Sequence, residues 1–75
     1  MTMHTNDRGE TFGAWLLDRA GDGNNIGRLA AVAKGDRRFR STSASDDLRM
    51  LLRADMADGD AFESVDEAET DWLTL

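Results

Sequence analysis

Residues 60–72 read DAFESVDEAETDW, and the spacing of their apolar side chains indicates the fold class. These side chains recur at intervals of three and four residues: Phe62, Val65, Ala68 and Trp72. This spacing places them on one face of an α-helix and leaves acidic residues on the other faces. Asp60 and Glu63 stand three residues apart, the spacing of a capping box at the start of a helix. The stretch therefore predicts an amphipathic, acidic helix that closes the domain.

A first helix is expected near the beginning of the chain. It starts close to Thr11, a good N-cap residue type, and its apolar stripe consists of Phe12, Trp15 and Leu16. Residues 21–25, GDGNN, stop it, because Gly, Asn and Asp tolerate turn conformations. Trp15 and Trp72 could serve either as exposed platforms for stacking or as core residues. A small bundle needs large buried side chains, and this favours the core for both.

A second helix follows the loop. Asn24 or Asn25 caps its start, and Gly35 is a natural C-terminal stop. Its apolar residues are Ile26, Leu29, Ala30, Val32 and Ala33. Gly27 and the alanines leave little side chain, so we expect a neighbouring helix to approach closely. Phe39 stands in the basic turn that comes next, and we expect it to plug the core at a helix junction.

The polar stretch 41–45, STSAS, leads into a third helix. Ser43 or Ser45 is expected to cap it, with two Asp residues in the first turn, where the helix dipole favours anions. Its buried stripe consists of Leu48, Leu51 and Leu52, and Met56 lies just beyond it. Residues 58–60, DGD, break this helix before the acidic one begins.

These four segments predict an all-α protein, a compact four-helix bundle without a sheet. No segment alternates apolar and polar residues, and the 75 residues contain no Cys and no Pro. We expect a flexible N-terminal arm over 1–10 and a single helical domain over 11–75. No run approaches the roughly 18 apolar residues of a membrane span, and the first ten residues lack the apolar core of a secretory signal. A cytoplasmic protein is therefore expected.

The arrangement of these apolar residues resembles the YozE family of small bacterial proteins. The resemblance is carried by Phe12-x-x-Trp15-Leu16, Ile26-Gly27-x-Leu29-Ala30, Asp36-x-x-Phe39, Ser45-x-x-Leu48-x-x-x-Leu52 and Phe62…Ala68…Trp72. It covers residues 11–73 and implies a four-helix fold similar to the sterile alpha motif. Arg40 follows Phe39 where the family usually has Pro. The family has no established catalytic residues, and sterile alpha motif folds are mostly interaction modules, which is an analogy at the level of the fold.

The net charge of −6 is unevenly distributed along the chain. Residues 1–53 hold nine basic and seven acidic residues, a balance of +2, whereas 54–75 hold eight acids and no base. We expect these eight to form an acidic partner-binding face: Asp55, Asp58, Asp60, Glu63, Asp66, Glu67, Glu69 and Asp71. A basic turn precedes them, with Lys34, Arg37, Arg38 and Arg40. Such segregation shapes association rather than fold.

No catalytic, cofactor or metal site is predicted. Carboxylates that act as general acids need an apolar pocket, and those of the last helix fit a solvated face better. Asp58-x-Asp60 opens like a calcium loop, but Phe62 and Glu63 then occupy positions that need a ligand and a glycine. Gly21, Gly23 and Gly27 differ by one residue from the glycine spacing of a dinucleotide-binding motif, and they follow a predicted helix instead of a strand. His4 has no Asp and Ser partners in a pattern that would suggest a catalytic triad.

Three functions remain, and the sequence favours them in the following order. The first is a non-enzymatic interaction module whose acidic C-terminal helix binds a basic protein surface. An inhibitor of a nucleic-acid-binding complex, acting as a DNA mimic or in the manner of an anti-CRISPR protein, is one form of it. The second is salt-sensitive, head-to-tail self-association of basic turn and acidic helix. The third is nucleic-acid binding through the basic turn at 34–40.

Overall fold

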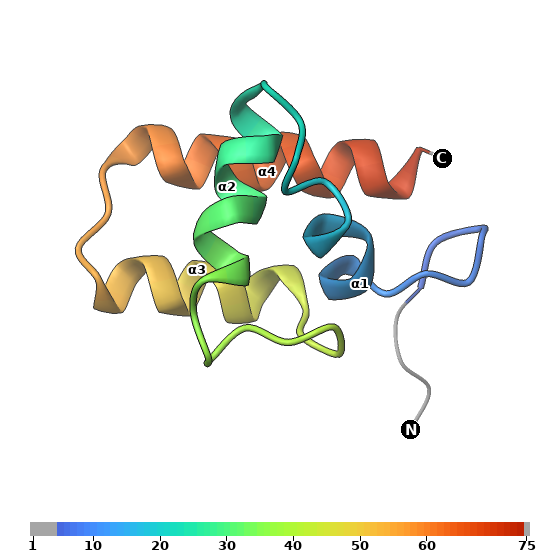
Figure 1. Ribbon diagram of the computed structural model, residues 1–75, viewed down its shortest axis with the longest axis horizontal. Helices are drawn as coiled ribbons and strands as arrows, with labels where there is room; N and C mark the ends of the chain where they lie inside the picture. Colours follow the sequence, from blue (N-terminus) through green and yellow to red (C-terminus); the bar gives the residue numbers. More distant parts are fainter. Residues whose placement is uncertain (1–4, 75) are drawn as a thin grey trace.

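Figure 1 shows the computed structural model, which describes residues 5–74. Its four helices are α1 (Phe12–Leu17), α2 (Asn25–Lys34), α3 (Ser45–Ala54) and α4 (Gly59–Leu73). Residues 5–74 contain no strand, only an isolated bridge between Thr5 and Thr11. The prediction of an all-α protein with four helices is confirmed for these residues. His4 and Leu75 lie outside the described residues.

The helices pack as a globule of about 31 × 27 × 19 Å. Helices α3 and α4 lie side by side along its long axis, and α2 crosses them (Figure 1). The short α1 fills the corner beside α2 and the C-terminal part of α4. Because α4 packs against all three other helices, one of its faces is buried and its remaining faces are left for solvent.

One hydrophobic core joins the four helices. Its buried side chains are Phe12, Trp15, Leu16, Ile26, Leu29, Ala30, Ala33, Phe39, Leu48, Leu51, Leu52, Val65, Ala68 and Trp72. The ring of Phe12 meets that of Trp72 edge-on, with centroids 5.6 Å apart. Both tryptophans are in the core as predicted, and Phe39 is buried at the helix junction. These aromatic contacts compensate for the small number of residues that the chain can bury.

The first two helix starts agree with the sequence, and the third does not. Thr11 accepts the N–H of Ala14 at 3.2 Å, and Asn24 accepts that of Gly27 at 2.8 Å. The N-cap position of α3 is occupied by Ala44, so the prediction of Ser43 or Ser45 is wrong.

The hydroxyls of both serines act elsewhere, which explains this difference. Ser43 accepts the N–H of Arg40 at 2.9 Å, and Ser45 donates its hydroxyl hydrogen to Glu69 on α4. At the start of α3, Asp47 instead accepts the N–H of Ala44 at 2.8 Å. This is the reciprocal half of a capping box, in which the side chain at the third helical position accepts the N–H of the N-cap residue, and no side chain accepts from the first turn at the N-cap itself.

Two glycines permit close approaches between segments. A Cβ at Gly27 would collide with the backbone of Asp22, and one at Gly13 would meet the carbonyl oxygens of three residues, Arg40, Ser41 and Ser43. The N–H of Gly13 also donates to the Ser43 carbonyl at 3.0 Å. The loops before α2 and before α3 are therefore held directly against helix backbone.

The segment that precedes α1 is fastened to the end of α4. Asn6 is buried, and its amide donates to the carbonyl of Trp72 at 3.2 Å. The indole N–H of Trp72 donates in turn to the carbonyl of Glu10 at 3.0 Å. Residues 5–10 thus make specific contacts with the domain, and the flexibility expected of the arm over 1–10 stays a prediction.

Two apolar side chains at or beside the apolar segments of α2 and α3 are exposed. Val32 is 53% exposed on α2, and Met56 is 90% exposed after the end of α3. Met56 has a φ of 55°, in the left-handed region, which ends the helical path and turns the chain toward α4. Within residues 5–74, no helix has the length and apolar character needed to cross a membrane.

Candidate functional site

Helix α4 carries six of the eight acids of residues 54–75, and it begins earlier than the sequence predicts. Its N-cap is Asp58, whose carboxylate accepts the N–H of Ala61 at 3.3 Å. The predicted capping box of Asp60 and Glu63 is wrong, because Asp60 already lies inside the helix. The charge of Asp58 faces the positive end of the helix dipole, so this carboxylate stabilises the start of α4.

Two further acids of α4 are held by α3 through one arginine. Arg49 donates to Asp66 at 2.7 Å and to Glu69 at 3.1 Å, and it also pairs with Asp46 at 3.1 Å. The hydroxyl of Ser45 and then the Arg49 guanidinium lower the pKa of Glu69 below its ordinary value of 4.5. The hydrogen bond to Asp66 contributes most to raising the pKa of Arg49. These acids therefore join two helices.

Asp55 belongs to a second internal network, at the C-terminal end of α3. Its carboxylate accepts from the guanidinium of Arg38 at 2.9 Å, and Arg38 also donates to Asp36 at 2.7 Å. The side-chain bond from Arg38 lowers the pKa of Asp36 from 3.8 to about 2. Arg38 of the basic turn and Asp55 are thus paired across the surface of the same molecule.

The remaining four acids form one line along α4, which we call the acidic stripe: Asp60, Glu63, Glu67 and Asp71. Their spacing of three, four and four residues places them on one side of the helix. All four are exposed, and none of their carboxylates has an ion-pair partner among residues 5–74. The eight acids expected to make a single face therefore divide into four with structural partners and four that are free.

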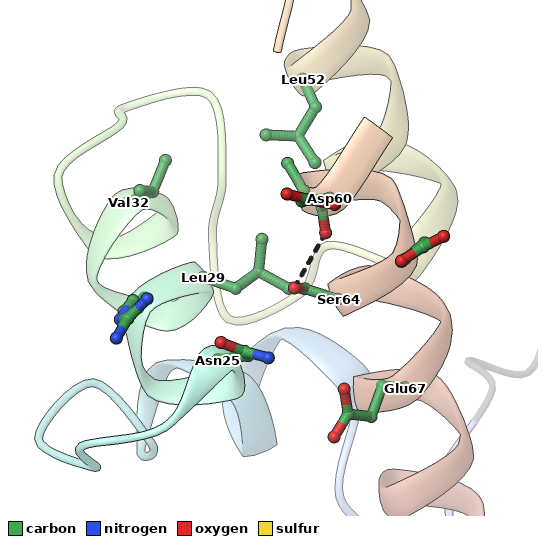
Figure 2. A pocket seen from close by; sticks show the side chains of 10 residues that line it. Asn25, Leu29, Val32, Leu52, Asp60, Ser64 and Glu67 are labelled. Carbon is green, nitrogen blue, oxygen red and sulfur yellow. Dashed lines mark hydrogen bonds between the residues drawn. The ribbon is translucent and has the colours of Figure 1, made fainter. Parts of the chain in front are cut away.

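A groove of about 500 Å³ runs between α2 and α4 beside the acidic stripe. Figure 2 shows its floor, where Leu29 of α2 points toward α4 and Leu52 of α3 reaches down from above. Its rim is polar, with the following side chains: Asn25, Arg28, Asp60, Glu63, Ser64 and Glu67. The half-exposed Val32 extends the apolar surface on the α2 side (Figure 2). The groove therefore combines an apolar floor with an excess of carboxylates.

The basic turn lies apart from this groove. Lys34 ends α2, and Arg37 and Arg40 are exposed in the loop that follows. Arg38 is paired with the two carboxylates described above through Nε and Nη2, with its shortest contacts at 2.7 and 2.9 Å. Of the four cations that the sequence groups together, one is thus already neutralised within the molecule.

Among residues 5–74, no group of three or more His, Asp or Glu side chains is placed so that it could hold a metal ion. Asp58 and Asp60, the start of the imagined calcium loop, are a helix cap and a residue of the first turn of α4.

Sequence reasoning missed the pairing role of Arg49 and the groove. Arg49 meets acids 17 and 20 residues away, and such pairing depends on how α3 and α4 pack. The only local signal is Asp46, three residues before it. Val32 fits the apolar spacing of α2, and only the packed structure reveals that no helix covers it.

The chain was compared with protein-family models, with curated proteins and with solved structures, and none of the three comparisons found a match.

Proposed function

We propose that the protein is a non-enzymatic interaction module that binds a basic surface of a partner protein through the acidic stripe of α4. The observation that carries this proposal is the division among its acids. Four carboxylates have structural partners, whereas the four of the acidic stripe are exposed and have none among residues 5–74. An uncompensated row of charge steers association with an oppositely charged surface and makes binding to that surface specific.

The spacing of the charges favours a protein surface over mimicry of duplex DNA. The acidic stripe runs from Asp60 to Asp71, a rise of about 16 Å at roughly 1.5 Å per residue, so its charges lie roughly 5 Å apart along the helix axis. Duplex DNA carries a charge about every 1.7 Å of its axis, and one strand about every 3.4 Å. A nucleic-acid-binding complex remains a suitable partner wherever it presents a basic patch about the length of α4.

The two other hypotheses have less support. Head-to-tail self-association and nucleic-acid binding both need a free basic turn, and Arg38 is occupied by Asp36 and Asp55. Lys34, Arg37 and Arg40 remain, which is a small number of cations against a net charge of −6. Affinity for nucleic acid rises with the number of phosphates neutralised, so three cations provide little.

We also propose that the fold is related to the sterile alpha motif, as the resemblance to the YozE family implies. Its support is that the residues carrying this resemblance are core residues, Phe12, Trp15, Phe39, Leu48 and Trp72 among them. An experimental structure tests this, because its helix order and crossing angles can be superposed on a sterile alpha motif.

The proposed function is tested by capture of partners on immobilised protein. The stripe variant changes all four free carboxylates: Asp60→Asn, Glu63→Gln, Glu67→Gln and Asp71→Asn. A matched control, the paired variant, changes Asp66→Asn and Glu69→Gln. We expect the wild type and the paired variant to capture the same basic protein from a host-cell lysate at about 0.1 M salt, and to lose it at about 1 M, where the Debye length falls to about 3 Å. Undiminished capture by the stripe variant would contradict the proposal.

A further inference from the structure

We propose that the groove between α2 and α4 receives an apolar side chain of the partner segment whose Lys or Arg residues contact the acidic stripe. The inference rests on the proposed function and names the chemistry of the partner: an amphipathic basic segment of a protein. The acidic stripe would then attract the segment, and the groove would select it.

The first support is the composition of the groove. Its floor is formed by Leu29, Leu52 and Ala61, and Val32 leaves about half of its surface uncovered at one side. A volume of about 500 Å³ lies within the usual range of roughly 300–1,000 Å³ for sites that enclose a ligand. An aliphatic side chain of a partner would cover the exposed part of Val32 and remove apolar surface from water.

The second support is the charge around the groove. Asp60, Glu63 and Glu67 stand on the α4 rim, and Arg28 is the one cation among the lining residues. Figure 2 shows Asp60 and Glu67 along the wall that faces Leu29. The lining therefore carries a net charge of −2, and the carboxylates of the rim would pair with cations placed on either side of an apolar anchor. This charge repels nucleic acid, so the fitting occupant is cationic and partly apolar.

The third support is that the exposed apolar side chains of residues 5–74 are poor occupants of the groove. In this part of the chain the large ones, other than Val32, are Met50, Met56 and Leu73. Met56 lies between Asp55 and Asp58, and Leu73 lies two residues after Asp71. Met50 lies beside Arg49, whose charge is already paired with three carboxylates of its own molecule, and three residues before Arg53. A second copy that inserted Met56 or Leu73 would bring its acids against the acidic rim. Charge complementarity therefore favours a different protein over a second copy.

The proposal is tested with two synthetic peptides of equal charge. One carries Lys and Leu on opposite faces of a helix, and the other has the same lysines with Gln in place of each Leu. Val32→Gln removes the apolar wall without changing charge, and Ala31→Gln, at an exposed position of α2 outside the groove, is the matched control. Circular dichroism checks that both variants fold.

We expect the Leu peptide to bind the wild type more tightly than the Gln peptide and to shift the methyl signals of Leu29, Val32 and Leu52 in NMR spectra. Val32→Gln should weaken the Leu peptide about three- to tenfold, the effect of losing part of one buried valine contact, and leave the Gln peptide unchanged. Ala31→Gln should change neither.

The outcomes separate the groove from the acidic stripe. Equal binding of the two peptides, lost in the stripe variant, would overturn the groove and keep the proposed function. If neither peptide bound at about 0.1 M salt, both the groove proposal and the proposed function would be contradicted. A wild-type dimer in sedimentation that Val32→Gln dissociates would assign the groove to a second copy and overturn the proposal.

Discussion

Replacing Arg49 by Met should destabilise the domain by about 1.5 kcal/mol. Arg49 is 25% exposed and pairs with three carboxylates, Asp46, Asp66 and Glu69. Asp46 and Asp66 are 88% and 74% exposed, so their pairs belong near the low end of the range of about 0.2–1 kcal/mol for surface ion pairs. Glu69 is 34% exposed, and its pair belongs near the high end. Met is unbranched and has a similar helix propensity, so the helix itself is little changed.

The measurement is thermal and urea unfolding of the wild type, Arg49→Met and the control Arg53→Met. Arg53 is exposed on the same helix and has no ion-pair partner among residues 5–74. A loss of about 1.5 kcal/mol lowers the Tm of a domain of this size by roughly 6–12 °C, whereas the control should lose about 0.5 kcal/mol or less. The difference should shrink at about 1 M salt. If Arg49→Met proved no less stable than Arg53→Met, the idea that Arg49 joins α3 to α4 would be refuted.

Three further predictions concern the core, a close approach and pH. Leu48→Ala removes a fully buried side chain and should cost about 2–5 kcal/mol in urea unfolding, and a loss below about 1 kcal/mol would contradict its central position. Gly27→Ala places a Cβ against the backbone of Asp22 and should lower the Tm, even though Ala favours helices over Gly by roughly 1 kcal/mol. An unchanged or higher Tm would mean that the loop before α2 moves away at little cost. The folded-state pKa of Glu69 lies below 4.5, so the stabilisation it provides is present above that pH and is lost as pH falls through the lower folded value. Unfolding measured against pH should therefore show a smaller acid loss in Glu69→Gln than in the wild type, and identical curves would be inconsistent with the lowered pKa.

The parts of the fold set by local interactions could be predicted from the sequence. Thr11 and Asn24 each cap a helix through an N–H three residues along the chain, and such signals are visible in a single stretch. The apolar spacing of α4 likewise identified Val65 and Trp72 as buried. Asp58 and Asp60 both fit the local signal for a cap, and only the register of the packed helix chooses between them.

The parts that depend on how helices face one another could not be predicted. The Ser45 hydroxyl donates a hydrogen bond to Glu69, 24 residues away, instead of capping its own helix. Val32 fits the apolar spacing of α2, yet no neighbouring helix covers it. The division of the acids has the same origin, since the position of Arg49 beside α4 determines which carboxylates are paired. The charge of the C-terminal region is a property of the sequence, and its partition into free and paired groups is a property of the fold.

Comparison of the stripe variant and the paired variant in one pair of assays shows whether the acidic stripe is the docking surface. The assays are calorimetric titration with the Leu peptide across a range of salt and thermal unfolding without it. We predict that the stripe variant loses at least about tenfold in affinity, shows a flatter salt dependence and keeps its Tm, because its carboxylates have no structural partners among residues 5–74. The paired variant should keep its affinity and lose stability, because Arg49 loses its partners on α4. The opposite pattern, with affinity lost in the paired variant and retained in the stripe variant, would contradict the assignment of the acidic stripe as the docking surface.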